Sequence, residues 1–164
     1  MYVINGFYTA MRDKYIAGKG IYYYVVAWDP EVFSWAHFRG ELIGATDPTT
    51  AAPASIRGKM LKTWEDLNLD KAPDVGDNGI HASAGPLEGL KERSTWLGYA
   101  PEEDPFGEHL LKWVGGDVAK IKPWLDNAEV EEAKNYGLKG KIFDLTEDKD
   151  SSWVLAFCNN LANA

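Results

Sequence analysis

The sequence contains one cysteine, Cys158, and no apolar run approaching the roughly 18 residues that span a bilayer. A single cysteine excludes an internal disulfide and every zinc site built from several cysteines, and it favours a reducing compartment. The opening residues, MYVINGFYTAM, lack the basic start and long apolar core of a signal peptide. We therefore expect a soluble, cytoplasmic protein with no membrane partner, in which Cys158 is inert.

Basic residues are also in deficit. There are 17 Lys and Arg against 25 Asp and Glu, which gives a formal net charge of −8. This sign is wrong for a protein that holds nucleic acid by its phosphates, so nucleic acid is not an expected partner. A small phosphorylated ligand is compatible with it, because a few Arg, Lys and backbone N–H groups can form a local anion site in an acidic protein.

The apolar content is sufficient for one core. The 164 residues are 45% hydrophobic and include seven Trp, and chains of this size bury roughly 70% of their unfolded surface. We expect residues 1–164 to form a single domain, in which 97–164 are an acidic C-terminal segment.

Local patterns indicate both helices and strands. Helical spacing of apolar residues predicts a helix over 7–16. Residues 21–28 (IYYYVVAW) are almost all β-branched or aromatic, which predicts a strand covered on both faces. Asp29 is a candidate N-cap for a second helix to about Arg39, and another helix is expected over 86–96. The sequence therefore indicates an α/β (α+β) protein.

Three short segments carry residues with chemical potential: GATDP (44–48), SIRGK (55–59) and NGIHASAG (78–85). Taken alone, each is a weak signal. A lone histidine such as His81 is more often a hydrogen-bonded core residue, and a lone arginine such as Arg57 is usually a surface or salt-bridged one. Only their order and spacing add information.

In that order, the segments resemble the nucleoside diphosphate kinase family, which carries GETNP, a proline-rich stretch, GTIRGD, NIIHGSDS and then a helix with a glutamate. The similarity covers Asn5 to about Trp96, more than half of the chain, and includes GFYTAMRDKY, which resembles the family's PFF-containing helix. The resemblance implies a ferredoxin-like antiparallel sheet with helices on its faces. It also implies a kinase that moves the γ-phosphate of a nucleoside triphosphate to a nucleoside diphosphate through a phosphohistidine.

The resemblance gives each matched residue a role. His81 resembles the phosphate-accepting histidine, and Glu92, eleven residues later, resembles the glutamate that holds its other ring nitrogen. Arg57 resembles the arginine that grips the outer phosphates. The other matches are to nucleotide contacts: Thr46 at the phosphates, Asn78 at the sugar hydroxyl, Ser83 beside the histidine and Phe7 under the base.

Cofactors and partners are implied in the same way. Nucleoside di- and triphosphates such as ATP would bind, Mg²⁺ would arrive with the nucleotide, and the chain would form a homo-oligomer. No metal site of the chain's own is predicted, because His37 and His109 have no carboxylate or cysteine at ligand spacing.

The family's first strand, helix and second strand have no counterpart before the PFF-like helix. One explanation is circular permutation, with a strand over 115–124, a helix, and a strand over 141–145. Lys122 would then replace the family's phosphate-binding lysine. The alternatives are a chain completed by another subunit and an unrelated C-terminal extension.

Some matched positions differ from the family's pattern. Asp47, Lys59 and Ala84 replace an Asn, an Asp and an Asp, and Arg39 is one position out of register with an arginine before GETNP. Losing one charge-assisted contact to a transition state typically costs on the order of 10²-fold in rate. The alternative function is therefore a catalytically weak or inactive nucleotide-binding or assembly module with the same fold.

Overall fold

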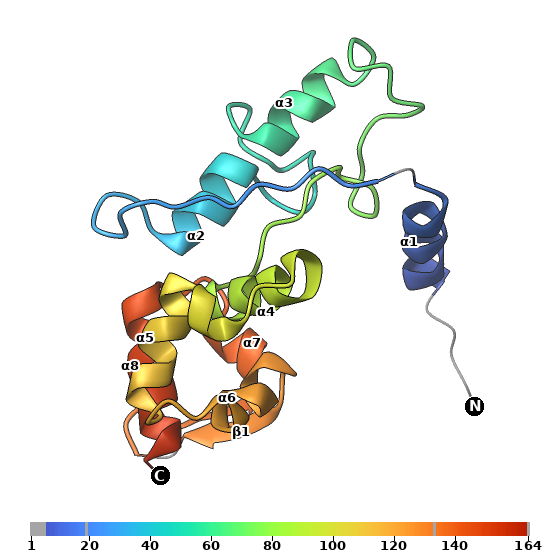
Figure 1. The fold of residues 1–164 in the computed structure, drawn as a ribbon. Helices are drawn as coiled ribbons and strands as arrows, with labels where there is room; N and C mark the ends of the chain where they lie inside the picture. The colour runs from blue at the N-terminus through green and yellow to red at the C-terminus, as the bar shows by residue number, and fades with distance from the viewer. Residues whose placement is uncertain (1–5, 19, 133, 164) are drawn as a thin grey trace, which may run out of the picture. The chain divides into compact units, whose positions relative to one another are not determined.

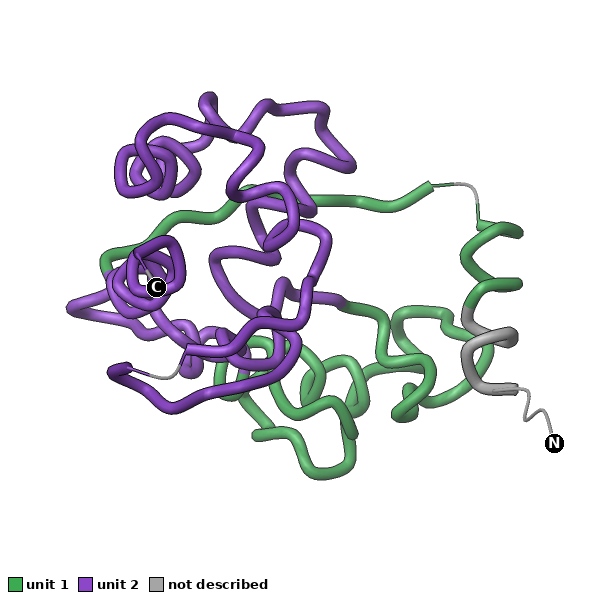
Figure 2. The backbone as a smooth tube through the Cα atoms, turned by 90° about the horizontal axis from the view of Figure 1, so that it is seen from below, with its two compact units in different colours: residues 1–29, 40–80 green, residues 30–39, 81–164 purple. Residues whose placement is uncertain are grey.

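The computed structural model describes residues 6–18, 20–132 and 134–163. The chain forms two compact units: a first unit of residues 1–29 and 40–80, and a second unit of residues 30–39 and 81–164 (Figure 2). The expectation of a single domain stays a prediction. Within the described ranges, every helix is too short or too polar to cross a membrane.

The first unit contains the helices α1 (Gly6–Ala17) and α3 (Ile56–Thr63). The predicted first helix is confirmed, and it ends just before Gly18. Helix α3 was not predicted. It begins at an N-cap, Ser55, whose buried hydroxyl accepts a hydrogen bond from the Gly58 N–H at 3.1 Å.

The predicted strand over 21–28 is wrong. The segment has no regular secondary structure, and it is exposed: Tyr22 and Tyr24 are 96% and 86% accessible to solvent. β-Branched and aromatic residues favour a strand only where a neighbouring strand pairs with them. Among the described residues the only sheet has two strands, and both come from 129–141. The four-stranded ferredoxin-like sheet is therefore not confirmed.

The helix expected after Asp29 begins later than predicted. Residues 30–33 form turns and a bend, and α2 (Trp35–His37) follows, continued by the π-helix η1 (Phe38–Ile43). The N-cap is Ser34, whose hydroxyl accepts a hydrogen bond from the His37 N–H at 3.2 Å.

The second unit is mixed α and β (Figure 1). Its remaining elements, in chain order, are α4 (Pro86–Leu97), the 3₁₀ helix η2 (Pro101–Glu103), α5 (Pro105–Trp113), α6 (Val118–Leu125), β1 (Glu129–Glu132), β2 (Leu138–Lys141), α7 (Ile142–Thr146) and α8 (Ser151–Ala162). β1 and β2 are antiparallel, with Glu129 opposite Lys141 and Glu132 opposite Leu138. The coarse α+β prediction is confirmed, and so is the helix expected over 86–96.

One apolar core supports this unit. α5 packs against α8, and α4 contacts α5, α6, α7 and α8. The fully buried side chains of the core are Leu87, Leu110, Ile121, Ile142, Val154, Phe157 and Cys158. Since Leu87 lies on α4, this core fixes the helix that carries Glu92.

The strand, helix, strand order expected over 115–145 is wrong. The chain instead forms α6, the β1–β2 hairpin and α7. Ile121, Trp124 and Leu125 are buried at helical spacing, and Asp117 caps α6 by accepting a hydrogen bond from the Ala119 N–H at 2.9 Å. Circular permutation is therefore not confirmed.

Lys122 is exposed on α6, where its Nζ donates to Asp126 Oδ2 at 3.0 Å. The strand that would have carried it to a phosphate site does not form.

Cys158 is fully buried in α8, and this burial raises the pKa of its thiol to about 12. Because the thiolate is the reacting form, we expect iodoacetamide to leave Cys158 unmodified in the folded protein and to alkylate it in guanidinium chloride. Mass spectrometry measures the modified fraction. Alkylation of the folded protein at the rate of a free thiol would contradict this prediction.

Candidate active site

His81 and Glu92 form the centre of the candidate site. The His81 Nε2 and Glu92 Oε1 atoms lie 2.6 Å apart, and the Ser83 hydroxyl donates to Glu92 Oε2. All these residues belong to the second unit. The structure therefore brings together three residues whose association was predicted from sequence.

Hydrogen bonds to several other elements fix the segment directly before α4, residues 83–84. The Ala84 N–H donates to the Glu88 carboxylate, and the Ala84 carbonyl accepts a hydrogen bond from the Asp148 N–H at 2.9 Å. Trp35 Nε1 donates to the Ser83 carbonyl at 3.0 Å. Pro86 occupies the first turn of α4, where a missing N–H has no cost. Residues 83 and 84, which follow His81, are thereby fixed to α4, Trp35 and Asp148.

The hydrogen bond between His81 and Glu92 dominates the electrostatics. It raises the pKa of His81, aided by the charges of Glu92 and Glu88 and opposed by burial and by Arg39. Burial would raise the pKa of Glu92, but hydrogen bonds from His81 and Ser83 outweigh it and lower the pKa. Glu92 is thus an anionic acceptor that favours a proton on Nε2.

The second ring nitrogen of His81 has a different environment. No hydrogen bond joins Nδ1 to any of the residues that the structure describes. The His81 side chain is 71% exposed. With Nε2 protonated toward Glu92, the lone pair of Nδ1 is accessible to a ligand.

Thr46, Arg57 and Asn78 assemble separately, in the first unit. The guanidinium of Arg57 donates to the Gly44 carbonyl at 2.6 Å and to the Ile80 carbonyl at 2.8 Å. The Asn78 amide donates to the Thr46 carbonyl at 3.0 Å. These bonds connect the GATDP loop, α3 and the segment before His81.

Two further positions belong to the resemblance, Phe7 and Arg39. Phe7 lies in α1, but its side chain is outside the described part of the structure, as is Asn5 at the start of the matched region. Arg39, which is out of register with the family pattern, donates to Glu147 at 2.9 Å and to Asp148 at 2.6 Å.

Glu88 is the site residue that the sequence patterns did not reveal. His81, Glu88 and Glu92 each offer one ligand atom, and these atoms all lie within 4.8 Å of one another. The available signal was the spacing of Glu88 and Glu92, which are four residues apart and therefore adjacent on one side of α4.

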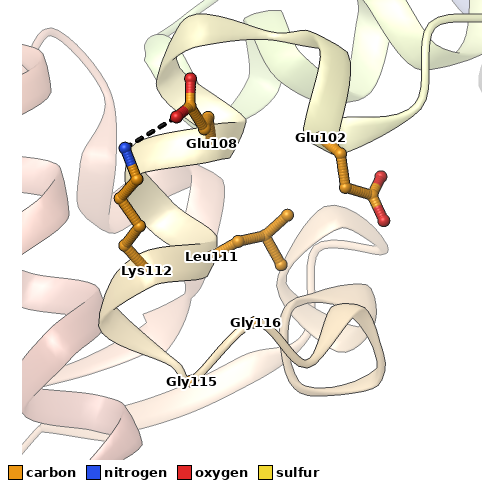
Figure 3. A pocket seen from close by; sticks show the side chains of 6 residues that line it. All are labelled: Glu102, Glu108, Leu111, Lys112, Gly115 and Gly116. Atoms are coloured by element: carbon orange, nitrogen blue, oxygen red, sulfur yellow. Dashed lines mark hydrogen bonds and ion pairs between the residues drawn. The ribbon is translucent and has the colours of Figure 1, made fainter.

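A shallow depression of about 400 Å³ lies elsewhere in the second unit (Figure 3). Its lining includes the Glu108–Lys112 ion pair, with 2.7 Å between the charged atoms, and Leu111. No predicted site residue lines it. The depression is therefore separate from the candidate site around His81.

A histidine with one nitrogen held by a carboxylate and the other accessible is an arrangement suited to nucleophilic group transfer. Over about half of its length, the chain is similar to nucleoside diphosphate kinases. It is 36% identical over 90 residues to that of Chloroflexus aggregans, covering 55% of this chain and 49% of that protein. It is 38% identical over 78 residues to nucleoside diphosphate kinase III, chloroplastic/mitochondrial, of Arabidopsis thaliana, covering 47% and 27%.

A third relative, the nucleoside diphosphate kinase of Roseiflexus sp., is 44% identical over 62 residues, or 38% of this chain and 33% of that protein. No family model and no solved structure matches. The chain thus spans between about a quarter and a half of the length of these relatives. The similarity supports a relationship to a nucleoside diphosphate kinase-like family over the matched half.

Proposed function

We propose that this chain is a nucleoside diphosphate kinase-like phosphotransferase that moves the γ-phosphate of a nucleoside triphosphate to a nucleoside diphosphate through a phosphohistidine on His81. The observation that carries the proposal is the 2.6 Å contact between His81 Nε2 and Glu92 Oε1. Glu92 favours the tautomer in which Nδ1 keeps its lone pair, which is the form that attacks phosphorus.

In the first half-reaction, His81 Nδ1 attacks the γ-phosphorus. The bond from phosphorus to the bridging oxygen breaks, and that oxygen leaves with the electron pair on the nucleoside diphosphate. The ring of phosphohistidine then carries a positive charge while its Nε2–H faces the Glu92 carboxylate, which stabilises it. In the second half, an oxygen of an acceptor diphosphate attacks the phosphorus, the N–P bond breaks, and Nδ1 regains its lone pair.

The resemblance assigns the nucleotide contacts to Thr46, Arg57, Asn78, Ser83 and Phe7. Mg²⁺ would enter with the nucleotide as part of the substrate, where it offsets phosphate charge. The cluster of His81, Glu88 and Glu92 does not fit Mg²⁺, because this ion prefers oxygen ligands in an octahedral arrangement.

One observation favours a second function, a weakly active or inactive nucleotide-binding or assembly module. Both terminal nitrogens of Arg57 donate to backbone carbonyls, those of Gly44 and Ile80. A guanidinium used in this way connects loops, and two of its five N–H donors are directed at the backbone and not at phosphate oxygens.

Incubation with ATP labelled at the γ-phosphate separates the two functions. We expect the protein to acquire label that is labile in acid and stable in alkali, and to transfer it to added GDP. If the protein binds each of the common nucleoside triphosphates but is never labelled, the kinase function is refuted and the nucleotide-binding module is supported.

Glu92→Gln tests how the histidine is positioned. The amide is nearly isosteric but carries no charge, so it no longer fixes Nε2–H or stabilises the charged ring, and we expect phosphorylation of His81 to slow by about 10-fold to 100-fold. Single-turnover labelling in a rapid-quench instrument measures the rate. Glu102→Gln, on the exposed 3₁₀ helix η2, is the matched control. Equal rates in the two variants would remove Glu92 from the mechanism.

A further inference from the structure

We propose that His81, Glu88 and Glu92 form a binding site for a Zn²⁺-like transition-metal ion, and that a metal ion bound there prevents phosphorylation of His81. The proposal of metal binding depends only on the distances between the ligand atoms of these residues. The proposed effect on phosphorylation also depends on the function proposed above. The three residues all belong to the second unit.

The distances fit a metal site after small side-chain adjustments. The three ligand atoms lie within 4.8 Å of one another. Bonds of about 2.0–2.2 Å from zinc to nitrogen or oxygen place two ligands of a tetrahedral ion roughly 3.3 Å apart. The side chains of His81 and Glu88 are not fully buried, so rotation about their side-chain bonds can bring the ligand atoms from their present separation to that of a tetrahedral site.

The backbone and neighbouring groups hold the carboxylates in place. Glu88 and Glu92 are one helical turn apart on α4, which is anchored in the core by the buried Leu87 and Leu90. The Ser83 hydroxyl binds Oε2 of Glu92, and the Ala84 N–H binds Oε2 of Glu88. Hydrogen bonds of this kind orient metal ligands and leave the other oxygen of each carboxylate for the ion.

The donor set selects the class of metal. One imidazole nitrogen and two carboxylate oxygens suit Zn²⁺ and its neighbours such as Co²⁺, whereas Mg²⁺ and Ca²⁺ prefer oxygen ligands alone. The two carboxylate charges balance a divalent ion. Three protein ligands also leave one position of a tetrahedral ion open to water or phosphate.

Metal binding and phosphorylation compete for one ring. His81 would coordinate through Nε2, the nitrogen that faces Glu92 at 2.6 Å. A neutral imidazole bound through Nε2 carries its proton on Nδ1. Nδ1 then has no lone pair for attack on phosphorus, so the bound metal ion inhibits the proposed phosphotransfer without any change of fold.

Calorimetric titration of the full, nucleotide-free chain with Zn²⁺ tests the site. We expect binding of a single ion that weakens by about 10-fold or more in Glu88→Gln and in His81→Ala. His109→Ala, on α5 and outside the cluster, is the matched control and should bind as the wild type does. Unchanged affinity in the two cluster variants would overturn the proposal.

A measurement on the wild type covers the case in which a variant fails to fold. Diethyl pyrocarbonate modifies accessible imidazoles, and mass spectrometry reports each histidine separately. Zn²⁺ is expected to slow the modification of His81 and to leave that of His109 unchanged, whereas Mg²⁺ should protect neither. Equal rates at His81 with and without Zn²⁺ would contradict the site.

Inhibition is tested in the labelling assay with Mg²⁺ and ATP in excess. Zn²⁺ should reduce phosphorylation of His81, and Glu88→Gln should need about 10-fold more Zn²⁺ for the same reduction. Zn²⁺ binding at the cluster without loss of labelling would overturn the inhibition. A protein that is never labelled, with or without Zn²⁺, refutes the proposed kinase and leaves the calorimetric result to decide the metal site.

Discussion

His81→Ala is expected to abolish phosphoprotein formation, reducing labelling by at least about 10³-fold, because no other group replaces a nucleophile that forms the covalent intermediate. His81 is exposed, and its side-chain contact in the structure is with Glu92. Its removal therefore leaves the apolar core intact, and circular dichroism should show an unchanged fold. Labelling with γ-labelled ATP, followed by peptide mapping, measures the effect.

His37→Ala and His109→Ala are the matched controls for this prediction. His37 lies in the short helix α2 and His109 in α5, and neither is a member of the His81 cluster. Both variants should be labelled as the wild type is. Persistent label in His81→Ala, combined with its loss in one of the controls, would assign the nucleophile to another histidine.

Phe157→Ala is expected to lower the free energy of unfolding of the second unit by about 3–5 kcal/mol. The Phe157 ring is fully buried in α8. It is stacked on Trp153, with centroids 5.2 Å apart and planes at 12°, and it meets Tyr136 at 5.6 Å. Alanine leaves a cavity among these rings and removes their contacts.

Urea titration followed by tryptophan fluorescence measures this loss through the midpoint and the slope. Tyr22→Ala is the control, because that ring is 96% exposed and exposed substitutions usually change stability by less than about 0.5 kcal/mol. Similar midpoints for the two variants would show that Phe157 does not support the core.

The sequence predicted the parts of the structure that depend on neighbouring residues. Helix α1 was expected from its apolar spacing, and α4 from the same signal after Pro86. Glu92 follows His81 by only eleven residues, so the two lie on neighbouring parts of the chain, and the short separation let motif spacing pair them.

Prediction failed where the state of a segment depends on distant residues. The run 21–28 has strand propensity, yet no described strand pairs with it. A strand over 115–124 was one explanation for the family elements that are missing, and it rested on a resemblance in three letters. Burial of Ile121, Trp124 and Leu125 at helical spacing instead makes residues 118–125 a helix. Glu88 was missed because its role depends on the distance to His81 across a turn.

From the sequence, the repeating apolar pattern determined α1 and α4, and the order and spacing of short motifs singled out His81, Glu92 and Ser83, because these features need only short stretches of chain. The tertiary structure alone decided that 21–28 joins no strand among the described residues, that Arg57 binds the Gly44 and Ile80 carbonyls, and that Glu88 lies in the histidine cluster. Pairing, burial and ligand distances are properties of residues that meet in space, and no local pattern specifies which partners will meet.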